Sequence, residues 1–101
     1  MAGTGSSGSA NGTGTSASFN FPYGITTDGT NLYVVDTSNH LIRKIVISTG
    51  AVTTVAGTGS SGSANGTGTS ASFKFPEGIT TDGTNLYVSD NYNHLIRKIV
   101  L

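Results

Sequence analysis

The stretch "NHLIRKIV" occupies residues 39–46 and returns unchanged at residues 93–100. The two copies lie 54 residues apart, and the same offset relates Phe19 to Phe73 and Tyr33 to Tyr87. A period of this length is typical of repeat architectures, in which each repeat is one structural unit that packs on its neighbours. The chain is therefore two copies of one unit, which we divide into residues 1–55 and 56–101.

The two copies are nearly identical. The stretch "AGTGSSGSANGTGTSASF" is the same at 2–19 and 56–73, and this degree of identity favours a recent duplication or a designed, consensus-like sequence. The second copy stops at Leu101 without a counterpart of Ser48–Thr54, so we expect it to lack its outermost strand. The differing positions are Asn20/Lys74, Tyr23/Glu77, Val35/Ser89, Thr37/Asn91, Ser38/Tyr92 and Ile47/Leu101.

Composition narrows the classes of function. The 101 residues suffice for one small domain, five basic side chains balance five acidic ones, and only 10% of residues are charged. Nucleic-acid binding depends on clustered basic contacts, so we expect no nucleic-acid partner. The start has neither the charged nor the apolar region of a signal peptide, and no apolar run is long enough for a membrane helix. We therefore expect no membrane partner and a cytoplasmic location on recombinant expression.

Each repeat has the pattern of short β-strands separated by turns. Short runs rich in β-branched and aromatic residues are bounded by Gly, Asp, Asn or Ser, including the hairpin turn "TDGTN". This pattern predicts a four-stranded antiparallel meander with strands at 24–28, 31–36, 40–47 and 51–56. The best helical candidate is a single turn at "TSASF", residues 15–19 and 69–73.

Both faces of the predicted strands are apolar. In "LYVV", Leu32 and Val34 point to one side while Tyr33 and Val35 point to the other. A sheet with one face in water would alternate apolar and polar residues more cleanly. The sequence therefore predicts an all-β fold of β-propeller blades, each covered on both faces by its neighbours.

The turn between the second and third strands carries a family resemblance. Asn39-His40-Leu41 and Asn93-His94-Leu95 follow strands that end in Asp36 and Asp90 and precede Ile-Arg-Lys-Ile, and this frame resembles the NHL repeat of β-propellers. The resemblance spans essentially the whole chain. It implies a propeller fold, but NHL propellers include protein-binding and RNA-binding platforms, sensor ectodomains and metal-dependent lyases, so it leaves the function open.

Two blades do not close a ring, because each end would leave an apolar face in water. Identical chains that pack head to tail form a closed ring when the rotation per chain divides the circle. Four chains would give eight blades and three chains would give six, and we favour eight because the long loops would be less crowded. We therefore predict a homo-oligomer, a tetramer or alternatively a trimer.

A glycine pattern after the strand at 51–56 imitates a nucleotide-binding loop. Gly57, Gly59 and Gly62 have G-x-G-x-x-G spacing, and Asp82 lies 20 residues beyond Gly62. The dinucleotide fingerprint also needs a helix that begins at this loop, which "SANGTGTSASF" does not supply. We interpret the segment as a loop between blades and predict no cofactor.

Two pairs of side chains are candidate metal ligands. His40 and His94 lie at turns of successive blades, too dispersed to converge on one ion, so we expect them and the preceding Asp to brace the turn by hydrogen bonds. Asp28 and Asp82 would form a carboxylate ring suited to Ca²⁺ or Mg²⁺, but Asp-Gly is common hairpin-turn chemistry and we favour turn formation. No metal site is predicted.

Arg43 and Arg97 interrupt otherwise apolar strands. We expect each to form an ion pair or stacking contact between blades, with Asp36 and Asp90 as partners, rather than to recognise a ligand. No Ser/His/Asp constellation stands out, so no catalytic residue is predicted.

Three classes of function remain. We favour a self-assembling symmetric propeller scaffold without catalytic activity. The alternatives are a module that binds a protein, peptide or glycan on its loop face or in its central channel, and an enzyme similar to the lyase branch, whose His-rich metal centre is missing here. Binding of a unique ligand tends to make blades diverge, whereas the loops at 2–19 and 56–73 are identical.

Overall fold

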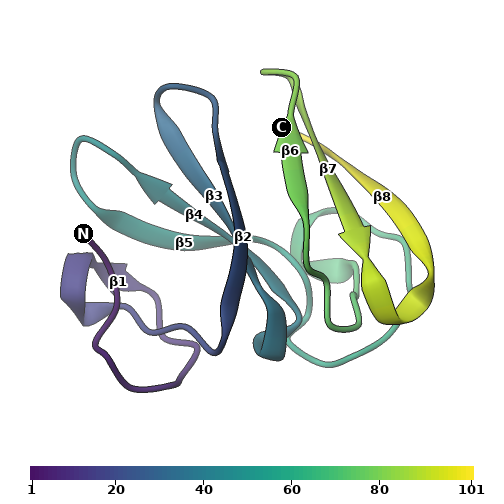
Figure 1. Cartoon of the computed structure of the whole chain (residues 1–101), viewed down its shortest axis with the longest axis horizontal. Coiled ribbons are helices and arrows are strands. Elements are labelled where there is room, and N and C mark those ends of the chain that lie inside the picture. Colours follow the sequence, from purple (N-terminus) through teal and green to yellow (C-terminus); the bar gives the residue numbers. More distant parts are fainter.

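The computed structural model describes all residues from 1 to 101 and contains one antiparallel sheet from each repeat (Figure 1). The first repeat forms a four-stranded meander, as predicted, and the second forms only three strands. The strands of the first meander are β2 (Pro22–Thr27), β3 (Asn31–Asp36), β4 (Leu41–Val46) and β5 (Ala51–Ala56), and those of the second are β6 (Ile79–Thr81), β7 (Asn85–Asp90) and β8 (Leu95–Val100).

The hairpin turns set the register of the strands. Between β2 and β3, the Asp28 carboxylate accepts hydrogen bonds from the backbone N–H groups of Thr30 (2.9 Å) and Asn31 (2.8 Å). Gly29 follows with φ of 93°, a conformation that glycine adopts without strain. The next hairpin pairs β3 with β4 without a shift, from Asn31 opposite Val46 to Asp36 opposite Leu41.

A short strand that the sequence analysis missed extends the first sheet. β1 (Gly12–Thr13) pairs antiparallel with the outer edge of β5, so the order is β1-β5-β4-β3-β2. Sequence did not indicate this strand, because it has only two residues and one of them is Gly, which is depleted in strands. It belongs to the Gly/Ser/Thr loop that precedes each blade, and its pairing holds that loop against the sheet.

The predicted helical turns are present but shifted toward the N-terminus. They are the 3₁₀ turns η1 (Gly14–Ser16) and η3 (Gly68–Ser70), which end where Ala17 and Ala71 adopt extended backbone. Two further turns, η2 (Thr37–Asn39) and η4 (Asn91–Asn93), connect the second and third meander strands of each blade. None of these turns has the length or apolar character needed to span a membrane.

The main hydrophobic core lies between the blades. It is made of Tyr33, Val35, Ile42 and Ala56 from the first repeat and Ala71, Phe73, Leu86 and Val88 from the second. A smaller cluster on the other face of the first blade contains Ala17, Val34, Ile45 and Val52. Neighbouring residues of β3 thus enter different cores, which confirms that both faces of the strand are apolar.

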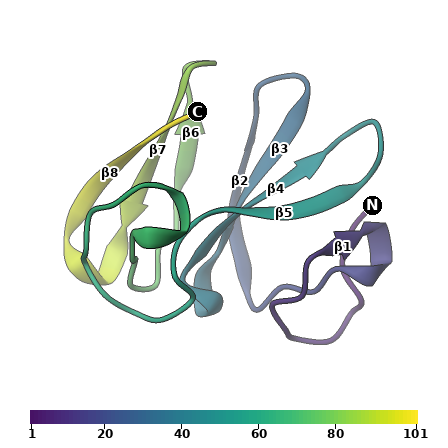
Figure 2. The same cartoon turned by 180° about the vertical axis from the view of Figure 1, so that it is seen from behind.

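The innermost strands of the two sheets, β2 and β6, lie side by side, and the other strands of each sheet spread outward from them like a fan (Figures 1 and 2). Gly24 of β2 lies so close to the second repeat that a Cβ atom there would collide with the carbonyl oxygen of Glu77. Glycine at this position therefore allows the close approach of the two blades near the centre of the fan.

Candidate functional site

A buried arginine organises each blade and its loop. Arg43 Nη1 lies 2.8 Å from Asp36 Oδ2, and both side chains are fully buried. The same guanidinium donates to the carbonyl oxygens of Ser18 (2.9 Å) and Ala10 (2.9 Å), while its Nε has no hydrogen-bond partner. Its Cζ lies 4.9 Å from the centre of the Phe19 ring. The predicted ion pair is present, but it joins β4 to the end of β3 within one blade rather than one blade to another, and the bonds to Ser18 and Ala10 attach the loop of the same repeat.

The second repeat contains the same arrangement. Arg97 Nη1 lies 2.8 Å from Asp90 Oδ2 and donates to the Ser72 carbonyl (3.0 Å), and its Cζ lies 4.8 Å from the Phe73 ring. The loop at 56–73 lies against the first blade, whereas no blade covers the loop at 2–19, yet both loops make the same contacts with their arginine. The conformation of each loop is therefore set within its own repeat.

The Asn of the repeated tripeptide connects the turn to the loop. Asn39 Nδ2 donates to Asp36 Oδ2 (2.7 Å) and to the Gly8 carbonyl (2.8 Å). Asp36 Oδ1 in turn accepts the backbone N–H of Asn20 (2.7 Å). The brace that the sequence analysis assigned to His and Asp together is thus made by Asn39 and Asp36.

His40 instead contacts the other blade. Its backbone has φ of 56°, and its Nδ1 accepts the backbone N–H of Phe75 (3.0 Å). The two rings meet edge to face at 4.5 Å. Burial lowers the pKa of His40 below its ordinary value, which favours the neutral imidazole that this hydrogen bond requires.

Phe75 and its counterpart Phe21 have the same unusual backbone. Their φ angles are 45° and 50°, a left-handed conformation that is uncommon for a bulky residue. Strain of this kind persists where the surroundings require it and gathers at functional positions. Phe75 packs against His40 of the first blade, whereas Phe21 is 77% exposed. The first blade therefore presents the same aromatic group with no partner.

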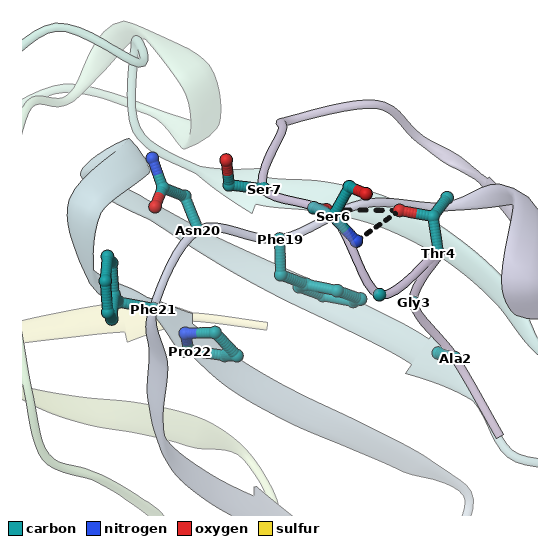
Figure 3. Close-up of a pocket in the computed structure, with 10 residues that line it drawn as sticks. Ala2, Gly3, Thr4, Ser6, Ser7, Phe19, Asn20, Phe21 and Pro22 are labelled. Atoms are coloured by element: carbon teal, nitrogen blue, oxygen red, sulfur yellow. Dashed lines mark hydrogen bonds between the residues drawn. The ribbon is translucent and has the colours of Figure 1, made fainter.

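An open pocket of about 530 Å³ lies on the side of the first blade that faces away from the second. It is bounded by the loop from Ala2 to Ser7 and by the segment from Phe19 to Pro22 (Figure 3). The corresponding surface of the second repeat is covered by the first blade: Thr37 Oγ1 donates to the Pro76 carbonyl (2.7 Å), next to the contact of His40 with Phe75. This pocket is thus the uncovered equivalent of the interface between the blades.

The face of the second blade that points away from the first is also uncovered, and it corresponds to the other half of the interface between the blades. Ile42 is fully buried between the blades, but its counterpart Ile96 is 77% exposed. An apolar depression of about 300 Å³ beside it includes Ile79, Tyr87 and Val88. The chain therefore ends in two different apolar faces, and each resembles one half of its own internal interface.

The remaining candidate residues have structural partners. Asp82, like Asp28, accepts two backbone N–H groups of its turn, those of Thr84 and Asn85, and these bonds lower its pKa to about 2. No three His, Cys, Asp or Glu side chains converge on a metal-sized site. Gly57 and Gly59 have positive φ, and the segment after them continues as loop to η3 without the helix that a dinucleotide site needs.

Sequence reasoning did not find the loop carbonyls that Arg43 binds, nor the contact of His40 with Phe75. Each of these residues recurs 54 positions along the sequence. This recurrence identifies equivalent positions of the two repeats, but it does not predict which atoms are in contact. These contacts are the ones that hold the loops and the blades in place.

Comparisons with known proteins agree with this arrangement. No protein-family model matches the chain. It is 47% identical over 83 residues to NHL repeat-containing protein 2 of Gallus gallus, an alignment that covers 80% of this chain and 11% of the relative. It is 37% identical over 99 residues to the protein of the same name from Homo sapiens, covering 93% of this chain and 14% of the relative.

A solved structure of unknown function from Bacteroides thetaiotaomicron superposes with a TM-score of 0.90 at 30% identity, over 98% of this chain and 26% of that one. An auxiliary nutrient binding protein from Bacteroides ovatus superposes with a TM-score of 0.81 at 29% identity, over 92% of this chain and 26% of that one. The chain thus spans about a tenth of the curated relatives and about a quarter of these structures. With the Asn-His-Leu turn, the buried Arg–Asp pair and the fan of meander strands in each repeat, the chain belongs to the NHL-repeat β-propeller proteins, and each of its two repeats is one blade.

Proposed function

We propose that this chain is a scaffold module that associates head to tail with copies of itself to close a propeller ring. The observation that carries the proposal is the pair of unequal blade faces. The internal interface buries Ile42 and covers Phe75, while Ile96 is 77% exposed on one end and Phe21 is 77% exposed on the other. Exposed apolar faces of this kind favour association.

The internal interface serves as a template for the external one. In it, His40 receives the N–H of Phe75, and Thr37 donates to Pro76. Between two chains, the equivalent arrangement would bring His94 of one copy to Phe21 of the next. The contact is heterologous, so it forms a closed ring when the rotation per chain divides the circle.

The two kinds of interface would not be identical. Ser89 replaces Val35 on the open face, and its Oγ accepts the backbone N–H of Gly78 (2.8 Å). Asn91 replaces Thr37, and its amide donates to Glu77 Oε2 (2.9 Å). A ring would therefore alternate between a more apolar joint within each chain and a more polar joint between chains.

We favour four chains and eight blades, with three chains and six blades as the alternative. The reason is steric: the loops of residues 2–19 and 56–73 must all lie around one ring, and a wider ring separates them. Both closures satisfy the requirement that every blade face is covered.

The second candidate is a module that binds a peptide, glycan or protein. Its support is the likeness to an auxiliary nutrient binding protein. The positions that differ between the repeats favour the scaffold, because their side chains contact other residues of the same chain. Asn91 donates to Glu77, and the ring centres of Tyr92 and Phe75 are 4.9 Å apart. We propose no catalytic activity for either candidate.

Native mass spectrometry tests the scaffold. We expect four times the 10.2 kDa chain mass, or three times for the six-blade ring. Ile96→Glu should give a folded monomer, because this side chain is exposed in the single chain and a carboxylate would be buried at the joint. The control Ser48→Glu introduces the same charge at an exposed turn and should leave the mass unchanged. A stable, folded wild-type monomer would contradict the proposal.

A further inference from the structure

The side chain of His40 joins the two blades at the end of the turn η2. Its Nδ1 accepts the backbone N–H of Phe75 over 3.0 Å, and the two rings meet edge to face at 4.5 Å. Nδ1 accepts a hydrogen bond only while it carries no proton, so the neutral ring in this contact has its proton on Nε2. The contact between the blades therefore depends on the charge of one side chain.

The donor in this contact is held in place by the second repeat itself. Phe75 has φ of 45°, and its counterpart Phe21 has φ of 50° although no histidine binds its N–H. The neighbouring backbone is bonded within the second blade: the N–H of Lys74 donates to Asp90 Oδ1 (2.8 Å), and the N–H of Tyr92 donates to the Lys74 carbonyl (3.1 Å). The Phe75 N–H thus keeps its direction whatever the state of its acceptor.

A protonated imidazole does not fit this position. Both of its nitrogen atoms carry hydrogen, so Nδ1–H would point at the N–H of Phe75, one donor against another. An N–H left without its acceptor costs free energy, and so does a cation withdrawn from water. A proton on Nδ1 of His40 and the place of its ring in the joint therefore exclude each other.

The charged groups around His40 do not compensate for the proton. Burial, the largest effect, lowers the pKa of His40 below its ordinary value of 6.5, while Asp90 raises it and Lys74 lowers it. Asp90, and Asp36 at the start of the same turn, already pair with arginine side chains, and Glu77 accepts a side-chain amide of its own blade. None of these carboxylates is free to hold an imidazolium in the joint.

We propose that His40 is an acid-sensitive latch between the blades, which holds the Phe75 backbone while neutral and leaves the joint when it takes up a proton. The moving part is the imidazole, because the donor is fixed by its own repeat. The blades stay together, since the apolar core between them has no group that titrates in mildly acidic solution. The latch lies within one chain and does not depend on the proposed ring.

Nuclear magnetic resonance of the ¹⁵N-labelled full chain tests the latch. At pH 7.5 we expect the His40 ring to carry its proton on Nε2 and the Phe75 amide to be protected from hydrogen exchange. At pH 4.5 the protection factor of that amide should fall about tenfold, the effect of one lost hydrogen bond. The Tyr92 amide, which bonds within the second blade, is the internal control and should keep its protection.

Two variants at position 40 separate the proton from the rest of the side chain. His40→Asn places Oδ1 where Nδ1 lies, suits the left-handed backbone (φ of 56°) and does not titrate, so the Phe75 amide should stay protected at both pH values. His40→Leu has no acceptor, so the same amide should exchange rapidly at both.

Three results would overturn the proposal. The first is unchanged protection of the Phe75 amide in the wild type at pH 4.5, and the second is the same acid-induced loss in His40→Asn. The third is an equal loss at the Tyr92 amide, which would show that the second blade unfolds as a whole instead of releasing one contact.

Discussion

Asp36 is the residue on which the local architecture of the first blade converges. Its two carboxylate oxygens bind the guanidinium of Arg43, the amide of Asn39 and the backbone N–H of Asn20. These partners come from a strand, a turn and a loop. A single buried charge thus holds three segments together, which is why its removal should have a large effect.

Asp36→Asn should destabilise the protein by about 3–5 kcal/mol, because it leaves the buried Arg43 guanidinium without a counter-charge. This is a large part of the roughly 5–15 kcal/mol that stabilises an ordinary domain. The measurement is chemical denaturation followed by circular dichroism. Asp28→Asn is the control, since this turn residue is exposed and Asn also caps turns. Equal midpoints for the two variants would contradict the role given to Asp36.

The His40–Phe75 contact should make stability depend on pH. Burial, the largest effect on His40, lowers its pKa in the folded protein below the ordinary 6.5, while Asp90 raises it and Lys74 lowers it further. The unfolded chain therefore binds the proton more readily, and stability should fall as the pH drops below about 6.5 toward the folded-state pKa.

Melting temperatures at pH 7.5 and pH 5.5 test this expectation. His40→Gln keeps an acceptor but does not titrate, so it should show a smaller loss of melting temperature on acidification than the wild type. An equal loss in both proteins would mean that other groups cause the acid sensitivity.

At the scale of elements, the two sheets differ in their outer strands. The first has β5 and β1 outside β4, whereas β8 is the outermost strand of the second. The three-stranded blade still packs, because the core between the blades draws Leu86 and Val88 from the middle strand β7. In the first blade the outer strand β5 supplies Ala56 to this core and Val52 to the smaller cluster on the other face.

Appending STGAVTT after Leu101 should restore a fourth strand in the second blade. The added valine would be buried as Val52 is, which contributes about 1.5–3 kcal/mol before the entropy of ordering the strand is subtracted. We expect the melting temperature to rise by several degrees, since 1 kcal/mol corresponds to about 4–8 °C in a domain of this size. The same extension with its valine replaced by aspartate is the control. No rise would show that the added segment does not pair with β8.

At the scale of the whole molecule, equivalent residues of the two repeats have different surroundings. Leu86 is fully buried between the blades, while Leu32 is only half-buried on the open face of the first blade. The sequence predicted a core position for both. The difference arises because a single chain covers one face of each blade and leaves the other open.

Comparing the stability losses of Leu86→Ala and Leu32→Ala tests whether chains associate. Leu86→Ala should cost about 2–5 kcal/mol as a core truncation in any state of association. Leu32→Ala should cost as much only if another chain covers the face on which it lies, and clearly less in a monomer. Denaturation of both variants at the same protein concentration makes the comparison. Equal losses support the ring, whereas a much smaller loss for Leu32→Ala argues against it.

The sequence by itself determined the features that depend on neighbouring residues. The 54-residue period defined two equal units, the Asp-Gly turns placed the hairpins, and the β-branched runs placed the four meander strands within about two residues of their observed ends. These features are predictable because turn chemistry and strand propensity act over a few residues. The pairing of Arg43 with Asp36 was also accessible, since a buried cation in an apolar strand requires a nearby anion.

Only the tertiary structure decided the contacts between distant segments. Arg43 binds carbonyl oxygens of Ala10 and Ser18, 33 and 25 residues away, and every residue has a carbonyl, so no side-chain pattern identifies them. Gly12–Thr13 becomes a strand because the edge of β5 pairs with it, although two residues in a Gly-rich loop do not predict one. His40 contacts Phe75 because the second blade stands beside the first. Such contacts depend on how rigid blades pack in space.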